Sequence, residues 1–268
     1  MAKQFELCGE RFVLIEEPTG SVLCSASESQ REMIDLVLAG PNAEAASPSL
    51  AGWGRGGAQR VALHSGLGTV LRPYRRGGFV RHLLEDQFYG GSSPLAPLPR
   101  PFRELLALIL VRGGGATAPK PLAAGVRRHP GSRWYRGSIL LREVEHAADL
   151  MSLDRSGDID EEHVIRYGFL SGIQAAKSLL GGVLHVDLHP GNVLVQPDES
   201  VWLIDFDRAE FLSPLRPLLR ARERLEERWS RAIVKHQLSP RLIDSFAAGL
   251  HSGLRPRDGT RTNEAGTR

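Results

Sequence analysis

Three polar side chains in the second half of the chain have the spacing that phosphoryl transfer from ATP requires. Asp187 and Asn192 fit the pattern H-x-D-x-x-x-x-N, and Asp205 opens a D-F-D sequence shortly after it. In this chemistry one acid meets the acceptor hydroxyl, while an amide and a second acid bind the magnesium ions of ATP. Asp187 is therefore the candidate catalytic residue, and Asn192 and Asp205 are candidate Mg²⁺ ligands. The alternative is that all three cap local turns, which any one of them alone would equally fit.

The residues between these side chains predict a β-hairpin. Val193–Val195 and Val201–Ile204 are apolar, mostly β-branched runs, and the turn-rich segment 196–200 joins them. A hairpin brings its entry and exit together, so Asn192 and Asp205 should emerge at the same end. Oxygen ligands converging beside a third carboxylate suit Mg²⁺, which proteins usually hold with few side chains plus substrate phosphates.

Composition indicates a globular enzyme-sized protein. The chain has 268 residues, of which 41% are hydrophobic and 24% charged, enough for two lobes around a cleft. Cys8 and Cys24 give no disulfide framework, and the longest apolar run, Leu105–Val111, is too short to cross a bilayer. With no signal-like start, we expect a cytosolic protein or one bound to a membrane from the cytosolic side.

Arginines dominate one acid-free stretch. Between Glu44 and Glu85 there is no acid, whereas six arginines lie there: Arg55, Arg60, Arg72, Arg75, Arg76 and Arg81. Such a stretch favours an anionic ligand, because guanidinium groups make forked contacts with phosphate and carboxylate. A nucleic-acid ligand is less favoured, because the arginines lack interleaved aromatic residues.

A second basic group runs from Arg216 to Lys235 and is diluted by three glutamates. A solvated helix with ion pairs and a membrane-surface contact both remain open for it.

A glycine-rich turn and a possible ion pair precede the opening motif. Gly54, Gly56 and Gly57 could let backbone N–H groups approach phosphates, although a flexible surface turn would look the same. Arg72 ends a strand-like run, and Glu104 lies in the first turn of a predicted helix near Pro101–Val111. The two could pair across the small lobe, or Glu104 could simply complement the helix N-terminus.

Several of these segments resemble one family. They are Val70–Phe79, Phe102–Glu104, Pro119–Pro121 and Trp202–Arg208, and together they resemble the bacterial 3-deoxy-D-manno-octulosonic acid (Kdo) kinases, lipopolysaccharide kinases of the protein-kinase-like fold. The resemblance implies an α+β, two-lobed fold with a small antiparallel-sheet N-lobe and a mainly helical C-lobe. The expected divisions are an N-terminal extension (1–51), the N-lobe (52–145), the C-lobe (146–251) and a disordered tail (252–268).

The resemblance also implies an activity and roles for the candidate residues. It implies ATP- and Mg²⁺-dependent phosphorylation of the 4-hydroxyl of Kdo in Kdo–lipid A, at the cytoplasmic face of the inner membrane. Asp187 matches the active-site aspartate, Asn192 and Asp205 the metal ligands, Arg72 and Glu104 the small-lobe ion pair, and Gly54 to Gly57 the phosphate loop. Arg75 and Arg76 are candidates for holding the anionic acceptor, unless they form a solvated basic turn.

Two features bear on the acceptor and on competing functions. Only a few residues separate Asp207 from the next helical region, so the chain lacks the long loop with which protein kinases dock peptides, and a protein substrate is not expected. A kinase for another sugar, such as a core heptose or an aminoglycoside, remains an alternative. A kinase-like protein without turnover is a third reading, because arginine replaces the usual small-lobe lysine.

Overall fold

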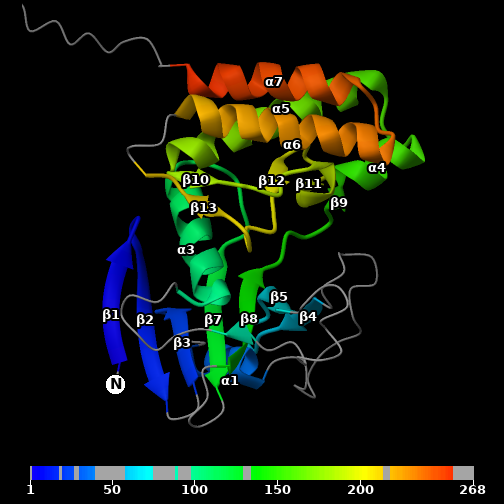
Figure 1. Ribbon diagram of the computed structural model, residues 1–268. Helices are drawn as coiled ribbons and strands as arrows, with labels where there is room; N and C mark the ends of the chain where they lie inside the picture. The colour runs from blue at the N-terminus through cyan, green and yellow to red at the C-terminus, as the bar shows by residue number, and fades with distance from the viewer. Residues whose placement is uncertain are drawn as a thin grey trace, which may run out of the picture.

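The computed structural model describes residues 2–17, 20–26, 30–39, 58–74, 88–89, 98–128, 134–213 and 218–255. They form a small lobe built on an antiparallel sheet and a larger, mainly helical lobe, which lies above the sheet in Figure 1. The chain passes from the small lobe to the large one directly after strand β8 (Trp134–Arg142).

The small lobe contains one antiparallel sheet. Its strands follow the order β1-β2-β3-β7-β8-β5-β4, and β6 pairs with β8 outside this order. The remaining strands are β1 (Ala2–Leu7), β2 (Glu10–Glu17), β3 (Gly20–Ser25), β4 (Gln59–Ala62), β5 (Gly68–Pro73), β6 (Phe88–Tyr89) and β7 (Pro121–Arg128). Because β3 pairs with β7, the first strands of the chain extend the sheet that carries Arg72.

Helices cover both faces of this sheet. On β8, Ile139 packs into the cluster that contains α3 (Arg100–Gly113), whereas its neighbour Leu140 packs into the cluster that contains α1 (Gln30–Ala39). Successive strand residues point to opposite faces, so a strand covered on both sides must be apolar at consecutive positions. The continuous apolar run in β8 follows from this, and the fully buried Leu105 fixes α3 against the sheet.

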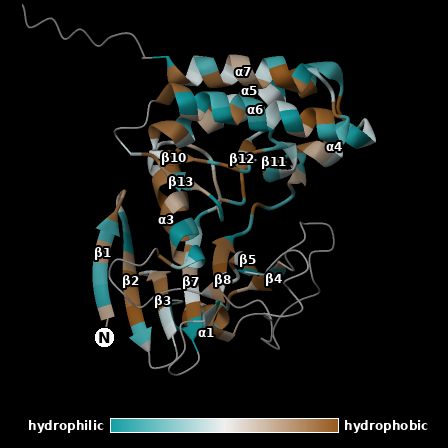
Figure 2. Ribbon diagram, viewed as in Figure 1, coloured by the Kyte–Doolittle hydropathy of each residue, from teal (hydrophilic) through white to brown (hydrophobic). Residues whose placement is uncertain are grey.

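The large lobe combines helices with two small sheets. Its elements are β9 (Ala148–Asp149), α4 (Leu150–Ser156), α5 (Glu161–Leu180), β10 (Val183–Leu184), a 3₁₀ turn (Pro190–Asn192), β11 (Val193–Val195), β12 (Val201–Leu203), β13 (Glu210–Phe211), α6 (Leu218–His236) and α7 (Arg241–Leu254). Strands β11 and β12 form the predicted hairpin, and β9 pairs with its β11 edge. Buried apolar residues of α5, α6, α7 and the hairpin belong to one core cluster. In Figure 2 each of these helices carries both apolar and polar residues.

Helices α5 and α7 approach closely because glycines line their contact. A Cβ atom on Gly172 would lie 2.2 Å from the carbonyl oxygen of Phe246, and one on Gly249 would lie 2.0 Å from that of Phe169. Only residues without a side chain permit this separation. The local sequence pattern does not predict α7, because glycine lowers helix propensity and here stabilises the helix through packing instead.

One expectation about the C-terminal end of the chain can be compared with the structure. Helix α7 continues to Leu254, so the helix extends three residues into the segment from Ser252 that we expected to be disordered. Residues 256–268 lie outside the described part of the chain. None of the helices in the described ranges combines the length and apolar character needed to span a bilayer.

Candidate active site

The hairpin places two of the candidate residues at one end, as the sequence predicted. Val193 pairs with Leu203, and the Ile204 N–H donates to the carbonyl oxygen of Asn192 at 3.0 Å. Asn192 therefore enters the hairpin beside the point where the chain leaves it toward Asp205. Asp205 has a φ of +66°, a left-handed conformation that aspartate tolerates better than most residues. This conformation turns the chain at Asp205, immediately after the strand.

Asp187 lies on a loop that is tied to the hairpin. The side-chain Nδ2 of Asn192 donates to the carbonyl oxygen of Asp187 at 3.0 Å. His185 anchors the start of the loop: its Nε2 lies 2.8 Å from the carbonyl oxygen of Ile204, and its ring lies 4.5 Å from that of Phe206. Burial lowers the pKa of His185, so the ring is neutral and donates this hydrogen bond. Hydrogen bonds thus join Asp187 to Asn192 directly, and both are tied to Ile204, the residue that precedes Asp205.

The predicted pair between Arg72 and Glu104 is present, and a third residue joins it. Arg72 binds Glu104 through Nη2 and Asp205 Oδ1 through Nη1, the latter at 2.6 Å. Burial disfavours the charged guanidinium, but the two carboxylates outweigh it and raise the pKa of Arg72. Burial also favours neutral Asp205, but Arg72 outweighs that effect and lowers the pKa of Asp205. The arginine that replaces the usual lysine therefore bridges α3 to the D-F-D segment.

Glu104 is fully buried and has a further partner that sequence analysis did not identify. The hydroxyl of Tyr74 donates to Glu104 Oε2, and the guanidinium carbon of Arg72 lies 5.6 Å from the centre of the Tyr74 ring. Burial raises the pKa of Glu104, and Arg72 opposes that rise. A signal for Tyr74 was available: residues two apart on a strand share a face, and Tyr74 follows Arg72 by two.

Asp207, which stands where kinases have the glycine of D-F-G, pairs with Arg100 at the start of α3. Arg100 also lies over the rings of Phe88 and Tyr74, at 5.0 and 5.6 Å from their centres. The neighbouring Arg103 donates to the carbonyl oxygen of Ala209 at 3.2 Å. Helix α3 thus contacts the D-F-D segment through Asp207 and the residues after it through Ala209.

The structure adds one unexpected partner for the candidate catalytic residue. Arg228, on α6, donates to Asp187 Oδ1 from Nε at 3.0 Å and from Nη2 at 2.6 Å. The two residues are 41 positions apart, and no local pattern in the sequence indicated the contact. The basic segment of α6 therefore enters the candidate site instead of lying wholly on the surface.

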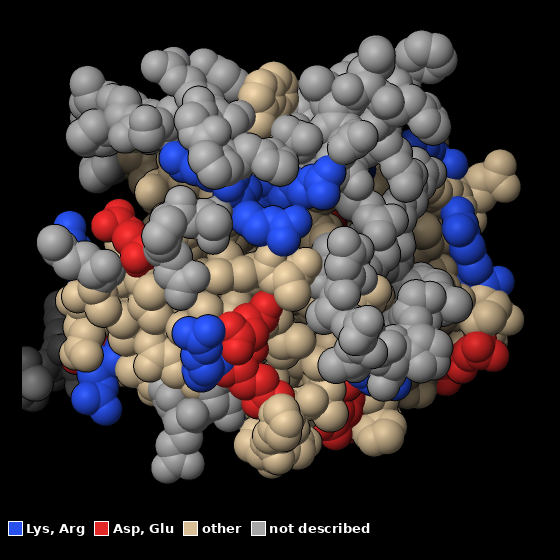
Figure 3. Space-filling view, turned by 90° about the horizontal axis from the view of Figure 1, so that it is seen from below, with Lys and Arg blue, Asp and Glu red and all other residues tan. Residues whose placement is uncertain are grey.

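Five of the predicted site residues lie outside the described residues: Gly54, Gly56, Gly57, Arg75 and Arg76. Of the arginines in the acid-free stretch, Arg60 and Arg72 are described, and both are paired, Arg60 with Glu143. Seen from the small-lobe side, the described basic side chains form separate groups, one of them directly against acidic ones (Figure 3). The described part of this stretch thus supplies no unpaired arginine for an anion.

The arrangement of Asn192 and Asp205 fits a magnesium ion carried by phosphates. Because Nδ2 of Asn192 donates a hydrogen bond to the backbone carbonyl of Asp187, Oδ1 of Asn192 is the atom left to bind a cation. Arg72 binds only Oδ1 of Asp205, which leaves Oδ2 for a cation. Within the described ranges no group of three His, Cys, Asp or Glu side chains could hold a metal alone. Oxygen donors in small number are what Mg²⁺ uses when phosphates complete its shell.

These features define a two-lobed protein of the kinase-like class. An ion pair joins the sheet lobe to α3, and a loop-and-hairpin unit carries an aspartate, an asparagine and a second aspartate. The solved structure "WaaP in complex with acyl carrier protein" has the same fold, with a TM-score of 0.52, 17% identity and coverage of 79% of this chain and 78% of that one. The two-lobed, kinase-like α+β fold expected from the sequence is confirmed.

The chain belongs to the lipopolysaccharide kinase (Kdo/WaaP) family, whose family model matches residues 52–241. Relatives named 3-deoxy-D-manno-octulosonic acid kinase include one from Xylella fastidiosa strain M12, 34% identical over 185 residues that cover 68% of each chain. Another, from Vibrio cholerae, is 32% identical over 155 residues, covering 58% of this chain and 62% of that protein. The matched region thus spans about three fifths of the Vibrio cholerae relative's length.

Proposed function

We propose that this protein transfers the γ-phosphate of ATP to the 4-hydroxyl of Kdo in Kdo–lipid A, during synthesis of the lipopolysaccharide core. Family membership and the relatives' names support the substrate class. The observation that carries the chemistry is that hydrogen bonds hold Asp187 and Asn192 together and tie Ile204, the residue before Asp205, to Asn192. A kinase-like protein without catalytic activity would not need these three polar side chains to lie together at the loop and the end of the hairpin.

In this proposal each residue has a defined task. Asn192 and Asp205 would hold the Mg²⁺ ion, which neutralises charge on the phosphates when ATP is bound. Asp187 accepts the hydrogen bond of the acceptor hydroxyl and orients its oxygen toward the γ-phosphorus. The new bond forms between that oxygen and phosphorus, the bond from phosphorus to the leaving oxygen of ADP breaks, and the hydroxyl proton passes to the Asp187 carboxylate. Gly54, Gly56 and Gly57 stay candidates for the phosphates, and Arg75 and Arg76 for the acceptor.

The experiment that tests this function compares two Asp→Asn variants on the same hairpin unit. Asp187→Asn should lower transfer of radiolabelled phosphate from ATP to Kdo–lipid A by at least about 10³-fold. Asp198→Asn, at the exposed turn between β11 and β12, is the matched control and should keep wild-type transfer. Substantial transfer by Asp187→Asn would refute the assigned role. If the wild-type protein transfers phosphate to a heptose acceptor and not to Kdo–lipid A, the protein is a kinase for another sugar of the lipopolysaccharide core.

We also propose that the protein binds the cytoplasmic face of the inner membrane peripherally. Phe211, Leu218 and Leu219 support this, since they are 40%, 38% and 52% exposed where β13 ends and α6 begins. Arg220 follows them directly, and apolar side chains next to basic ones suit an anionic membrane surface. Replacing both leucines with asparagine should reduce sedimentation with phosphatidylglycerol-containing vesicles. Val234→Asn, 73% exposed further along α6, should leave it unchanged.

A further inference from the structure

Basic side chains form a single row along α6. Arg220, Arg224, Arg228, Arg231 and Lys235 are spaced by four, four, three and four residues, which keeps them within about 80° of arc on a helix. We call these five residues the α6 basic row. The glutamates that dilute this segment in sequence, Glu223, Glu226 and Glu227, fall outside that arc. The row adjoins the buried side of α6, where Leu225 and Trp229 pack into the core.

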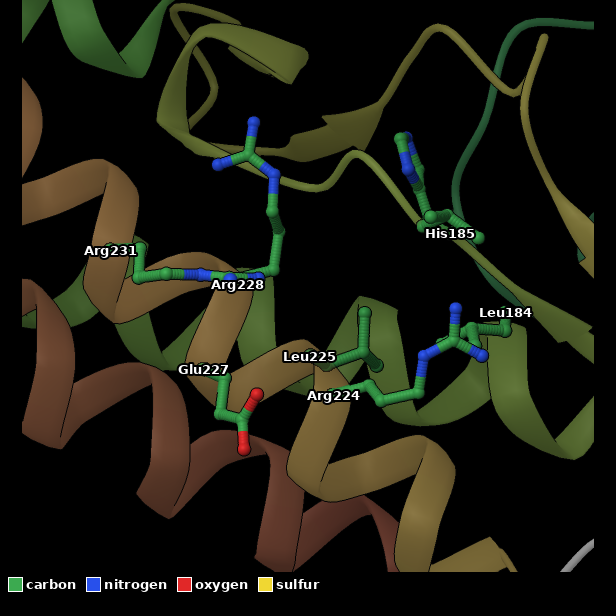
Figure 4. Close-up of a pocket in the computed structure, with 8 residues that line it drawn as sticks. Leu184, His185, Arg224, Leu225, Glu227, Arg228 and Arg231 are labelled. Atoms are coloured by element: carbon green, nitrogen blue, oxygen red, sulfur yellow. The ribbon is translucent and has the colours of Figure 1, made fainter.

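The centre of this row opens into a small pocket beside the candidate catalytic loop (Figure 4). The pocket has a volume of about 150 Å³ and lies between α6 and the segment that leads to Asp187. Its lining residues are Leu184, His185, Val186, Arg224, Leu225, Glu227, Arg228 and Arg231. A pocket of this size can hold one carboxylate or phosphate group.

The contact between Arg228 and Asp187 leaves one atom of each free to meet a ligand. Both hydrogen bonds from Arg228, through Nε and Nη2, end on Oδ1 of Asp187. Among the described residues, Oδ2 of Asp187 and Nη1 of Arg228 have no hydrogen-bond partner within reach. An acceptor could therefore offer its hydroxyl to Oδ2 and an anionic group to Nη1 without breaking the contact.

The other charged groups at the pocket decide which arginine is available. Arg224 is neutralised by Glu210, with two contacts of 2.8 and 2.9 Å. Arg231 is exposed and has no ion-pair partner among the described residues. The carboxylate of Glu227 points away from the guanidinium of Arg228 in Figure 4, and His185 is uncharged because burial lowers its pKa. Positive charge at the pocket is thus concentrated on Arg231 and the free edge of Arg228.

We propose that the pocket on the α6 basic row binds an anionic group of the acceptor, a carboxylate or a phosphate, next to the hydroxyl that is phosphorylated. Arg231 and Nη1 of Arg228 hold the anion, and Arg228 at the same time orients Asp187. This assignment rests on the proposed function for the identity of the acceptor, and it gives α6 a role that the sequence analysis left open between a solvated helix and a membrane contact.

The first test separates binding from chemistry. Arg231→Gln should raise the KM for Kdo–lipid A about tenfold, and leave kcat and the KM for ATP within about twofold of wild type. Arg228→Gln should raise the same KM and also lower kcat, because Asp187 loses its support. Arg228→Lys should retain part of the binding but not the two-bond contact. The control is Arg241→Gln, an exposed arginine on α7 that pairs with Glu161, which should match wild type.

The acceptor can be altered in parallel to identify the anion. If the group is the sugar carboxylate, reducing it to an alcohol should raise the wild-type KM by a similar factor, and Arg231→Gln should add little to that loss. If the group is a lipid A phosphate, removing that phosphate should instead raise the wild-type KM, and Arg231→Gln should add little to that increase. The proposal is overturned if Arg231→Gln leaves the acceptor KM unchanged, or if it raises the KM for ATP equally.

A second measurement does not depend on turnover. Binding of free Kdo and of inorganic phosphate, followed by calorimetry without ATP, should be detectable for wild type and lost in the Arg228→Gln/Arg231→Gln double variant. If wild type transfers no phosphate to Kdo–lipid A but still shows this difference, the proposed function fails and the anion pocket stands. If wild type binds neither anion, or the double variant binds as well as wild type, the pocket is refuted whatever the substrate.

Discussion

Replacing Arg72 with methionine should destabilise the protein in a way that depends on pH. Methionine fills similar volume but removes the charge that faces Glu104, whose side chain is fully buried. The carboxylate then keeps only the hydroxyl of Tyr74 as a partner. Asp205 also loses a partner, but its side chain is 41% exposed and water can replace the lost contact. The main effect therefore comes from Glu104.

The size of the effect follows from the two states open to Glu104. If it stays ionised, the loss of its buried partner costs about 3–5 kcal/mol. If it becomes protonated, the cost is about 1.4 kcal/mol for each pH unit above the unfolded-chain pKa of about 4.3, or about 3.7 kcal/mol at pH 7 and about 1.6 at pH 5.5. Glu104 adopts whichever state costs less free energy. The free energy of unfolding of the variant should therefore fall by about 3–4 kcal/mol at pH 7, but by only about 1.6 kcal/mol at pH 5.5.

The sign of this pH dependence follows from the pKa shift. Burial raises the pKa of Glu104, and without Arg72 only the hydrogen bond from Tyr74 opposes that rise. A raised pKa in the folded state gives stability that is present at low pH and is lost as pH rises through the folded-state pKa. The variant should therefore recover stability relative to wild type as the solution is acidified from pH 7 to 5.5.

Urea unfolding followed by fluorescence and circular dichroism at both pH values measures this difference. The double variant Arg72→Met/Glu104→Gln is the control, because it lacks the titrating carboxyl group. The difference in unfolding free energy between this variant and Arg72→Met should therefore change between pH 5.5 and pH 7. A destabilisation by Arg72→Met that is the same at pH 5.5 and pH 7 would refute the reasoning, since an uncompensated buried carboxylate could not then be its source.

Three further predictions concern the large lobe. Trp229→Phe should lower the free energy of unfolding by about 1–3 kcal/mol, because the hydrogen bond that Nε1 of the buried Trp229 donates to the carbonyl oxygen of Leu242 at 2.8 Å is lost and the smaller ring leaves space in the core. Gly249→Ala should destabilise by about 1–3 kcal/mol in urea unfolding, since its methyl group would overlap the carbonyl oxygen of Phe169. His185→Gln should remove a loss of stability that wild type shows below about pH 6.5, because a lowered folded-state pKa makes protonation favour unfolding.

Each of these predictions has its own contradicting outcome. Ser252→Ala, at an exposed position of α7, is the control for Gly249→Ala and should change stability by less than about 0.5 kcal/mol. If Gly249→Ala and Ser252→Ala have equal unfolding free energies, α5 and α7 can move apart without loss of stability. Unchanged stability of Trp229→Phe would show that the lost hydrogen bond is replaced. If the pH profile of His185→Gln overlays that of wild type between pH 5 and 7, His185 is not the titrating group.

Sequence patterns were sufficient where the structure depends on short-range pairing. The hairpin and the placement of Asn192 and Asp205 at one hairpin end agree with the structure, because apolar runs and turn residues act within a few residues. Helix α7 was missed, since its glycines weaken the local signal and its stability comes from contact with α5.

Longer-range pairings were only partly accessible. The pair of Arg72 and Glu104 was one of two alternatives that the positions of these residues left open, the family resemblance implied it, and the structure contains it. The second contact of Arg72, to Asp205, joins residues 133 positions apart, and that between Arg100 and Asp207 joins residues 107 apart. Nothing in local spacing relates such positions, because the lobes must pack before the side chains can meet.

The amino-acid sequence by itself determined which residues could carry phosphoryl transfer, since a loop and a hairpin fix the positions of Asp187, Asn192 and Asp205 through local hydrogen bonds. Only the tertiary structure decided what surrounds them. In the sequence, the five arginines of α6 are interspersed with three glutamates, and nothing shows which arginine faces the site. Packing of Leu225 and Trp229 into the core fixes the rotation of the helix, and this rotation directs Arg228 to Asp187.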